Sequence, residues 1–255
     1  MIQARYAVRS NIIVAPNIHV LSFHAPGIAS TVLPGQFVQI RVSDSTAPLL
    51  RRPFSVYRVA GPVVEIVFAA IGAGTTILSS YQPPRTLDVI GPLGNAFGVA
   101  GEQDDAILVG GGLGVAPLPI LTEALERRSR PIRTFLGART AGQILTQHLL
   151  NVEAATDDGS RGFHGTVVEL LRLHLRGEGV RRAKIYGCGP NAMLRSLARL
   201  AGEYRIPCEL SLESAMACGI GLCQGCPVER TSGGKKYSLV CTEGPVFDAQ
   251  SVNIP

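Results

Sequence analysis

The first hundred residues carry short apolar runs that are separated by turn residues. Segments 37–42 (FVQIRV) and 63–70 (VVEIVFAA) are rich in β-branched and aromatic residues, which favours strands. Glycine and proline punctuate the chain between such runs, at 33–36, 60–63, 81–84 and 91–95. Short strands at this spacing predict a closed or nearly closed antiparallel barrel.

Beyond residue 104 the pattern changes to alternating strands and helices. Residues 106–128 run from an apolar strand through a glycine loop into a helix. Strands expected at 132–138 and 184–190 alternate with helices expected at 166–175 and 191–204. This alternation predicts a Rossmann-like α/β domain with a parallel sheet.

The last part of the chain is short and rich in cysteine. About fifty residues there contain five of the six cysteines. A segment of this length is too short to form another ordinary domain unless a metal or a covalent cross-link stabilises it. We therefore expect an α+β multi-domain protein: a barrel at 1–101, a nucleotide domain at 102–207 and a small metal-binding domain at 208–255.

Composition and charge exclude several classes of protein. Of the 255 residues, 46% are hydrophobic and 17% charged, which is typical of a globular protein. No apolar run is long enough to span a bilayer, and the first residues lack the apolar core of a signal peptide. A cytoplasmic location is expected, with cysteines that are reduced or bind metal. The net charge is +5, and the basic cluster at 125–133 has no interleaved aromatics, so neither nucleic acid nor membrane is an expected partner.

The glycine loop at 109–118 (VGGGLGVAPL) is the first candidate binding site. Gly112 and Gly114 would let the backbone approach a pyrophosphate, although Pro117 stands where G-x-G-x-x-G has its third glycine. A tight turn without a ligand is the alternative. A second glycine turn at 186–190 (YGCGP) also follows an expected strand, which favours nucleotide binding at this edge of the sheet.

The order of several motifs carries a family resemblance. Residues 51–57 (RRPFSVY) offer a cation, an aromatic wall and a hydroxyl, although alone they also fit an ordinary strand. Followed by IGAGTTIL, GPLGNAF, GGGLGVAPL and CGP, they resemble the ferredoxin–NADP reductase superfamily. The cysteine-rich end further resembles the branch of dihydroorotate dehydrogenase B electron-transfer subunits, over essentially the whole chain.

This resemblance implies roles for particular residues. Arg52 would meet the diphosphate of FAD, Phe54 would flank the flavin and Ser55 would lie near its reactive edge. Many relatives have tyrosine at the position of Phe54, so a hydroxyl contact is absent here. The other residues implied in FAD binding are Pro53, Val67, Phe68, Ala69, Gly74 and Thr75. Those implied in nicotinamide-nucleotide binding are Gly112, Gly114, Pro117, Cys188 and Gly189, of which Cys188 also fits a small buried residue.

Four cysteines form a candidate cluster site. Cys218, Cys223 and Cys226 have the C-x4-C-x2-C order of plant-type [2Fe–2S] ligands, and Cys241 would be the fourth. Four thiolates could instead hold zinc. Cys208, which flanks an expected strand, is expected in the core.

The resemblance implies an oxidoreductase subunit in pyrimidine biosynthesis that uses FAD, a [2Fe–2S] cluster and NAD(H). No residue is expected to act as a catalytic acid or base. The implied partner is the catalytic dihydroorotate dehydrogenase subunit, a flavin-containing (β/α)8 barrel, in a heterotetramer. One alternative is the diaphorase subunit of a hydrogenase or another ferredoxin-linked complex, and another is a non-catalytic binding protein with structural zinc. Arg139 could engage the 2′-phosphate of NADPH, but a helix cap or a ribose contact is favoured.

Overall fold

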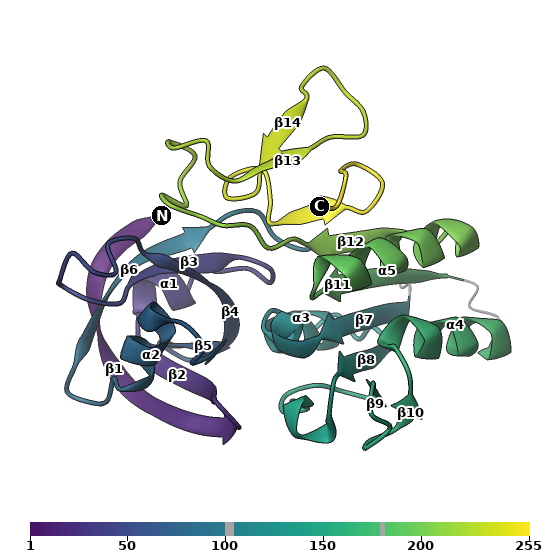
Figure 1. Cartoon of the computed structure of the whole chain (residues 1–255), viewed down its shortest axis with the longest axis horizontal. Coiled ribbons are helices and arrows are strands. Elements are labelled where there is room, and N and C mark those ends of the chain that lie inside the picture. The colour runs from purple at the N-terminus through teal and green to yellow at the C-terminus, as the bar shows by residue number, and fades with distance from the viewer. Residues whose placement is uncertain (100–104, 179–181) are drawn as a thin grey trace.

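The computed structural model describes residues 1–99, 105–178 and 182–255. The predicted boundary between residues 101 and 102 lies outside these ranges. A barrel lies beside an α/β sheet, and the C-terminal residues extend over the junction between them (Figure 1).

The N-terminal part is a closed six-stranded antiparallel barrel, which confirms the predicted architecture. Its strands follow one another around the barrel in the order β1-β2-β5-β4-β3-β6. Their bounds are β1 (Ile2–Ala15), β2 (Ile18–His24), β3 (Phe37–Arg41), β4 (Arg52–Ala60), β5 (Val63–Ala69) and β6 (Thr86–Leu93), with short helices α1 (Pro26–Ala29) and α2 (Ala73–Ser79) between strands. Alternate residues of each strand fill the interior, as Val38 and Ile40 of β3 do.

The second part is a seven-stranded sheet with helices packed on it, which confirms the predicted strand–helix alternation. The strand order is β10-β9-β8-β7-β11-β12-β15, with every pair parallel except β12 and β15. The strands are β7 (Asp105–Gly111), β8 (Ile132–Ala138), β9 (Val152–Thr156), β10 (Phe163–His164), β11 (Ala183–Cys188), β12 (Cys208–Ser211) and β15 (Val246–Asp248). The segment after residue 207 therefore contributes two strands to this sheet.

The helices of this part lie where the sequence predicts them, although α4 extends to Glu178, three residues beyond the end of the helix expected at 166–175. They are α3 (Leu118–Glu126), α4 (Val167–Glu178) and α5 (Asn191–Tyr204), with 3-10 turns at Gly112–Val115 and Ala141–Gln143. Thr166 and Glu169 form a capping box at the start of α4, with Thr166 N donating to Glu169 Oε2 at 2.8 Å and Glu169 N to Thr166 Oγ1 at 3.2 Å. Helix α5 ends at Tyr204, and its C-cap residue Arg205 has a left-handed φ of +53°.

The parts of the chain pack closely on one another. Helix α3 lies between the barrel and the sheet (Figure 1), and Arg58 of β4 pairs with its Glu123 at 2.8 Å. The short hairpin of β13 (Pro227–Glu229) and β14 (Tyr237–Leu239) lies above the junction in the same view. Among the described helices, none combines the length and apolarity that a bilayer crossing needs.

Candidate functional site

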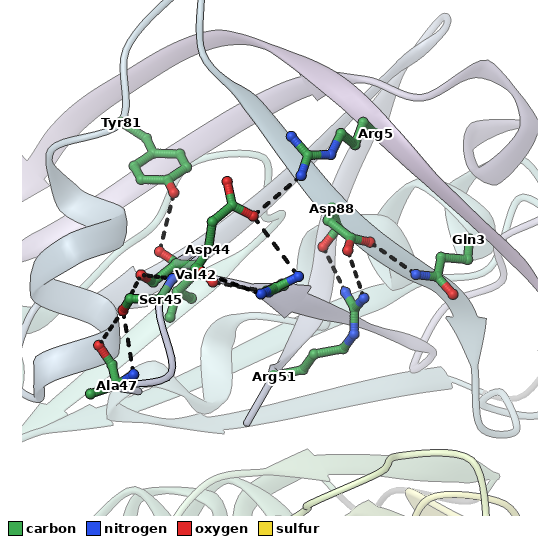
Figure 2. A network of polar contacts seen from close by, with 11 residues as sticks. Gln3, Arg5, Val42, Asp44, Ser45, Ala47, Arg51, Tyr81 and Asp88 are labelled. Carbon is green, nitrogen blue, oxygen red and sulfur yellow. Dashed lines mark hydrogen bonds and ion pairs between the residues drawn. The ribbon is translucent and has the colours of Figure 1, made fainter. Parts of the chain in front are cut away.

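Arg51 and Arg52, two adjacent arginines where β4 begins, have different partners, and Figure 2 shows those of Arg51. Arg51 Nη2 pairs with Asp88 Oδ2 at 2.8 Å, and Arg51 Nη1 donates to the Asp88 carbonyl at 2.9 Å. Burial alone would raise the pKa of Asp88, but the hydrogen bond and charge of Arg51 hold it below its usual value. Arg52 donates only to the carbonyls of Leu50 and Arg51, and no carboxylate pairs with it within the described residues. Arg52 is thus the cation of this pair that remains available to an anion.

Arg52 lies against the first turn of α2. A Cβ added to Gly74 would lie 3.2 Å from Arg52 Nε and 3.3 Å from Val42 Cγ2, so the side chain covers the glycine closely. Thr75 Oγ1 accepts the N–H groups of Ile71 and Gly72 at 3.2 and 3.1 Å, which fixes the loop before the helix. The structure therefore brings the predicted residues Arg52, Gly74 and Thr75 to one end of the barrel.

The predicted aromatic residues of the flavin site lie inside the barrel. Phe54 is 8% exposed, and its ring meets Phe68 edge-on with centroids 5.8 Å apart. Phe68 in turn stacks on His19 at 5.3 Å. Since Phe54 belongs to the interior set, its strand neighbours Pro53 and Ser55 lie on the outer face.

The glycine loop packs directly on the turn after β11. Gly114 has no room for a side chain, because a Cβ there would lie 2.1 Å from the carbonyl oxygen of Cys188 and 2.5 Å from Gly189 Cα. Gly112 has a φ of +55° and faces open space. Pro117 is the residue that precedes α3. The structure thus brings together all five residues predicted for the nicotinamide nucleotide.

A cavity of about 680 Å³ opens above this loop, between the barrel and the edge of the sheet where the parallel strands end. Ala69 of the barrel and Gly112 of the loop both line it, as do Arg139 and Asp157 at the ends of β8 and β9. Ligands of such sheets bind at this edge. The cavity has the place and size expected of a nucleotide site.

Cys188 lies beneath this region as a neutral thiol. It is 3% exposed, and in the sheet it is paired with Gly110 and Ser211. Burial, with a further contribution from the Glu213 carboxylate, raises the pKa of Cys188 to about 12. A thiol in this state is a small, close-packed group and not a nucleophile.

The cysteine-rich loop turns its backbone N–H groups toward sulfur. Ile220 N and Cys223 N lie 3.5 and 3.4 Å from Cys218 Sγ. Desolvation would raise the pKa of Cys218, but these donors outweigh it and lower the pKa to about 6. Such donors stabilise a thiolate, the form that binds metal.

The other predicted ligands lie near Cys218. Cys226 and Cys241 are each 2% exposed and belong to a core cluster that includes Phe37 of the barrel. Burial and the neighbouring thiol of Cys226 raise the pKa of Cys241 to about 11. No disulfide joins these four cysteines, and among the described residues no group of three or more side chains has metal-coordinating geometry. Four soft sulfur donors with backbone N–H groups nearby nevertheless fit an iron–sulfur cluster chemically.

Three residues of this region were missed by sequence reasoning. Asp88 sets the roles of the two arginines, Asn95 connects the barrel to the segment after Cys241, and Gln39 lies under the cysteine loop. Asp88 and Asn95 carry no spacing signal because their partners are distant in sequence. Gln39 is a polar residue between the apolar Val38 and Ile40, a pattern that any half-exposed strand has, so nothing in the sequence indicated a functional role for it.

Comparison with known proteins matches the chain along its length. A family model described as the iron–sulfur cluster binding domain of dihydroorotate dehydrogenase B matches residues 213–253. The dihydroorotate dehydrogenase B (NAD(+)) electron transfer subunit of Desulforamulus reducens is 38% identical over 247 residues, or 94% of each chain. The protein of the same name from Geobacillus kaustophilus is 35% identical, with 97% of each chain covered.

Solved structures agree with this assignment. An NADH-dependent reduced ferredoxin–NADP oxidoreductase, described in work on flavin-based electron bifurcation, superposes with a TM-score of 0.87 at 28% identity over 98% of this chain and 90% of that one. Phthalate dioxygenase reductase shares the fold, with a TM-score of 0.64 at 15% identity and 91% and 87% coverage. Together with the barrel, the cavity above the glycine loop and the cysteine loop, these similarities show that the chain belongs to the family of dihydroorotate dehydrogenase B (NAD(+)) electron transfer subunits.

Proposed function

We propose that this chain passes electrons between NAD(H) and a partner flavoprotein that oxidises dihydroorotate, by way of FAD and a [2Fe–2S] cluster. One observation carries this proposal: a barrel with an available arginine, a glycine loop under a nucleotide-sized cavity and a four-cysteine segment pack against one another in one chain.

The FAD site is proposed on the barrel. Arg52 supplies a positive charge for the diphosphate, and Gly74 lets that charge lie close to the start of α2. Ser55 and Pro53 offer the outer face of β4, while Phe54 and Phe68 support the strands from within. Val67 lies on the outer face of β5, where it packs in the same cluster as Tyr57. Ala69, which is implied in FAD binding, also lines the cavity above the glycine loop, and this supports flavin and nicotinamide sites that are next to each other.

The NAD(H) site is proposed at the cavity above Gly112 and Gly114. Gly114 packs on the Cys188–Gly189 turn, next to the cavity-lining residues Gly112 and Pro190, and Pro117 precedes helix α3. Asp157 is a carboxylate that lines the cavity and would disfavour the extra phosphate of NADPH. We therefore assign the site to NADH, with Arg139 at the ribose.

The cluster site is proposed at Cys218, Cys223, Cys226 and Cys241. Zinc is the alternative occupant of four thiolates, but the x4 spacing and the named cluster-binding domain favour iron–sulfur. FAD supplies the chemistry that joins two-electron exchange with nicotinamide to one-electron exchange with the cluster. The chain itself binds and orients the carriers, which agrees with the neutral, buried state of Cys188.

The relatives' names favour this function over a diaphorase subunit of a hydrogenase. The words "electron transfer subunit" imply a catalytic partner subunit, and a heterotetramer with a flavin-containing (β/α)8 barrel is the assembly that we propose. We propose that the three parts divided at 101/102 and 207/208 carry the three functions. The last part also supplies β12 and β15 to the sheet of the second part. The cytoplasmic location stays a prediction.

Purification under anaerobic conditions tests the function directly. We expect one FAD, two irons and two inorganic sulfides per chain, bleaching of the flavin by NADH, and no oxidation of dihydroorotate until the catalytic subunit is added. Zinc in place of iron, or dihydroorotate oxidation by the chain alone, would contradict the proposal.

A further inference from the structure

Gln39 is a fully buried amide without a partner. Its side chain is 0% exposed, and neither Nε2 nor Oε1 has a hydrogen-bond partner within the described residues. Burying an amide without a partner costs free energy, because the group gives up its hydrogen bonds to water. The position therefore calls for a ligand that completes it.

Strand alternation shows which way the side chain points. Val38 and Ile40, its neighbours in β3, fill the interior of the barrel, so Gln39 lies on the outer face. On that face it is directly paired with Pro53, within the motif predicted to bind the flavin. Phe37, which shares the outer face, packs in the same cluster as Cys226 and Cys241.

The amide also touches the cysteine loop. A Cβ added to Gly219 would lie 2.4 Å from Gln39 Nε2 and 2.7 Å from Gln39 Cγ, so Gln39 lies over the α-carbon next to Cys218. Gly219 has a φ of +72°, which a residue with a side chain rarely adopts. Gln39 thus lies between the strand proposed for flavin binding and the loop proposed for the cluster.

We propose that the side-chain amide of Gln39 donates a hydrogen bond to a sulfur of the [2Fe–2S] site and so raises the reduction potential of the cluster. The inference rests on the proposed function. Sulfur ligands of a cluster carry negative charge, and that charge increases when the cluster takes up an electron. A donor to sulfur therefore stabilises the reduced state more than the oxidised state.

The test compares variants that keep the shape of the side chain. Gln39→Met preserves its length and removes both polar atoms, and Gln39→Leu is a second apolar variant in case the first does not fold. Thr134→Val is the matched control, because Thr134 Oγ1 is also buried and has no hydrogen-bond partner among the described residues, but it lies on β8 in the α/β sheet. Midpoint potentials are measured by titration of the electron paramagnetic resonance signal in the purified chain.

We expect Gln39→Met to retain iron and FAD at wild-type amounts and to titrate at a lower potential than wild type. A tenfold loss in the ratio of reduced to oxidised cluster corresponds to about 59 mV for one electron. The cluster of Thr134→Val should have the same midpoint potential as the cluster of the wild type. An unchanged potential in an intact Gln39→Met or Gln39→Leu cluster would overturn the inference, whereas a wild-type chain without a [2Fe–2S] signal would overturn the proposed function itself.

Discussion

Asn95 and Val246 exchange two hydrogen bonds between the barrel and the sheet. Asn95 Nδ2 donates to the Val246 carbonyl at 2.7 Å, and Val246 N donates to Asn95 Oδ1 at 2.9 Å. Asn95 Nδ2 also donates to the carbonyl of Glu243, two residues after Cys241. One side chain therefore connects the barrel to the segment that follows the last proposed cluster ligand.

Asn95→Ala should loosen that connection. The variant leaves the N–H of Val246 without its partner, so we expect a loss of about 1–3 kcal/mol in the free energy of unfolding and faster loss of iron on dilution. Denaturant unfolding and iron release measure the two effects. Asn253→Ala is the control, because the substitution removes an exposed side-chain hydrogen bond from Asn253 Nδ2 to Glu229 Oε2 and leaves the backbone bond in place. Equal effects of the two variants would contradict a special role for Asn95.

Variants of Arg51 and Arg52, which are adjacent where β4 begins, should separate an effect on FAD binding from an effect on the stability of the protein. Arg52→Ala should weaken FAD binding by about 10- to 100-fold, since a charge-assisted contact to phosphate is lost. Arg51→Ala should lower the stability of the protein but leave the FAD affinity near wild type, because Arg51 is already neutralised by Asp88. Equilibrium dialysis with FAD tests both, and equal FAD affinity in the two variants would remove Arg52 from the site.

The Arg51–Asp88 pair should make stability depend on acid pH. Because the pKa of Asp88 is lowered in the folded state, its contribution is complete above the carboxyl's ordinary pKa of about 4 and is lost as pH falls through the lower folded value. The stability difference between wild type and Arg51→Met should therefore be largest near neutrality and shrink below about pH 4. Unfolding curves between pH 3 and pH 7 would show a constant difference if the ion pair contributed nothing.

The glycine loop should not accept a side chain at its closest contact. In Gly114→Ala the new methyl group meets the Cys188 backbone, so the loop must shift. We expect a KM for NADH that is at least about tenfold higher and a loss of about 1–3 kcal/mol in stability. Gly177→Ala, in α4 with open space around it, should instead stabilise the protein slightly. Unchanged NADH kinetics in Gly114→Ala would place the nucleotide elsewhere.

Local sequence signals predicted the elements but not their partners. Helix 191–204 and strand 132–138 have the bounds that their apolar periodicity indicates, because both are formed from neighbouring residues. The pairing of β12 with β15 joins segments almost forty residues apart, and its short strands carry no periodicity of their own.

The candidate site was predictable to the same extent as the fold: its local motifs could be recognised, but its contacts between distant residues could not. Cysteine spacing and glycine loops are local patterns, so Cys218 and Gly114 could be proposed as site residues from the sequence alone. Gln39 and Asn95 are defined by contacts to residues that are far along the chain, at Gly219 and Val246. Only the fold shows that these contacts exist.

We propose that electrons leave this chain for the partner subunit through the cluster. Cys223→Ser and the control Cys208→Ala, which changes a buried cysteine of β12, are each assembled with the catalytic subunit and assayed with NADH. The measurement is the ratio of NADH-dependent orotate reduction to NADH-dependent ferricyanide reduction, with iron content determined on the same samples. We predict that Cys223→Ser retains ferricyanide reduction and loses orotate reduction, while Cys208→Ala retains both. Full orotate reduction by a Cys223→Ser complex that contains no iron would contradict the account.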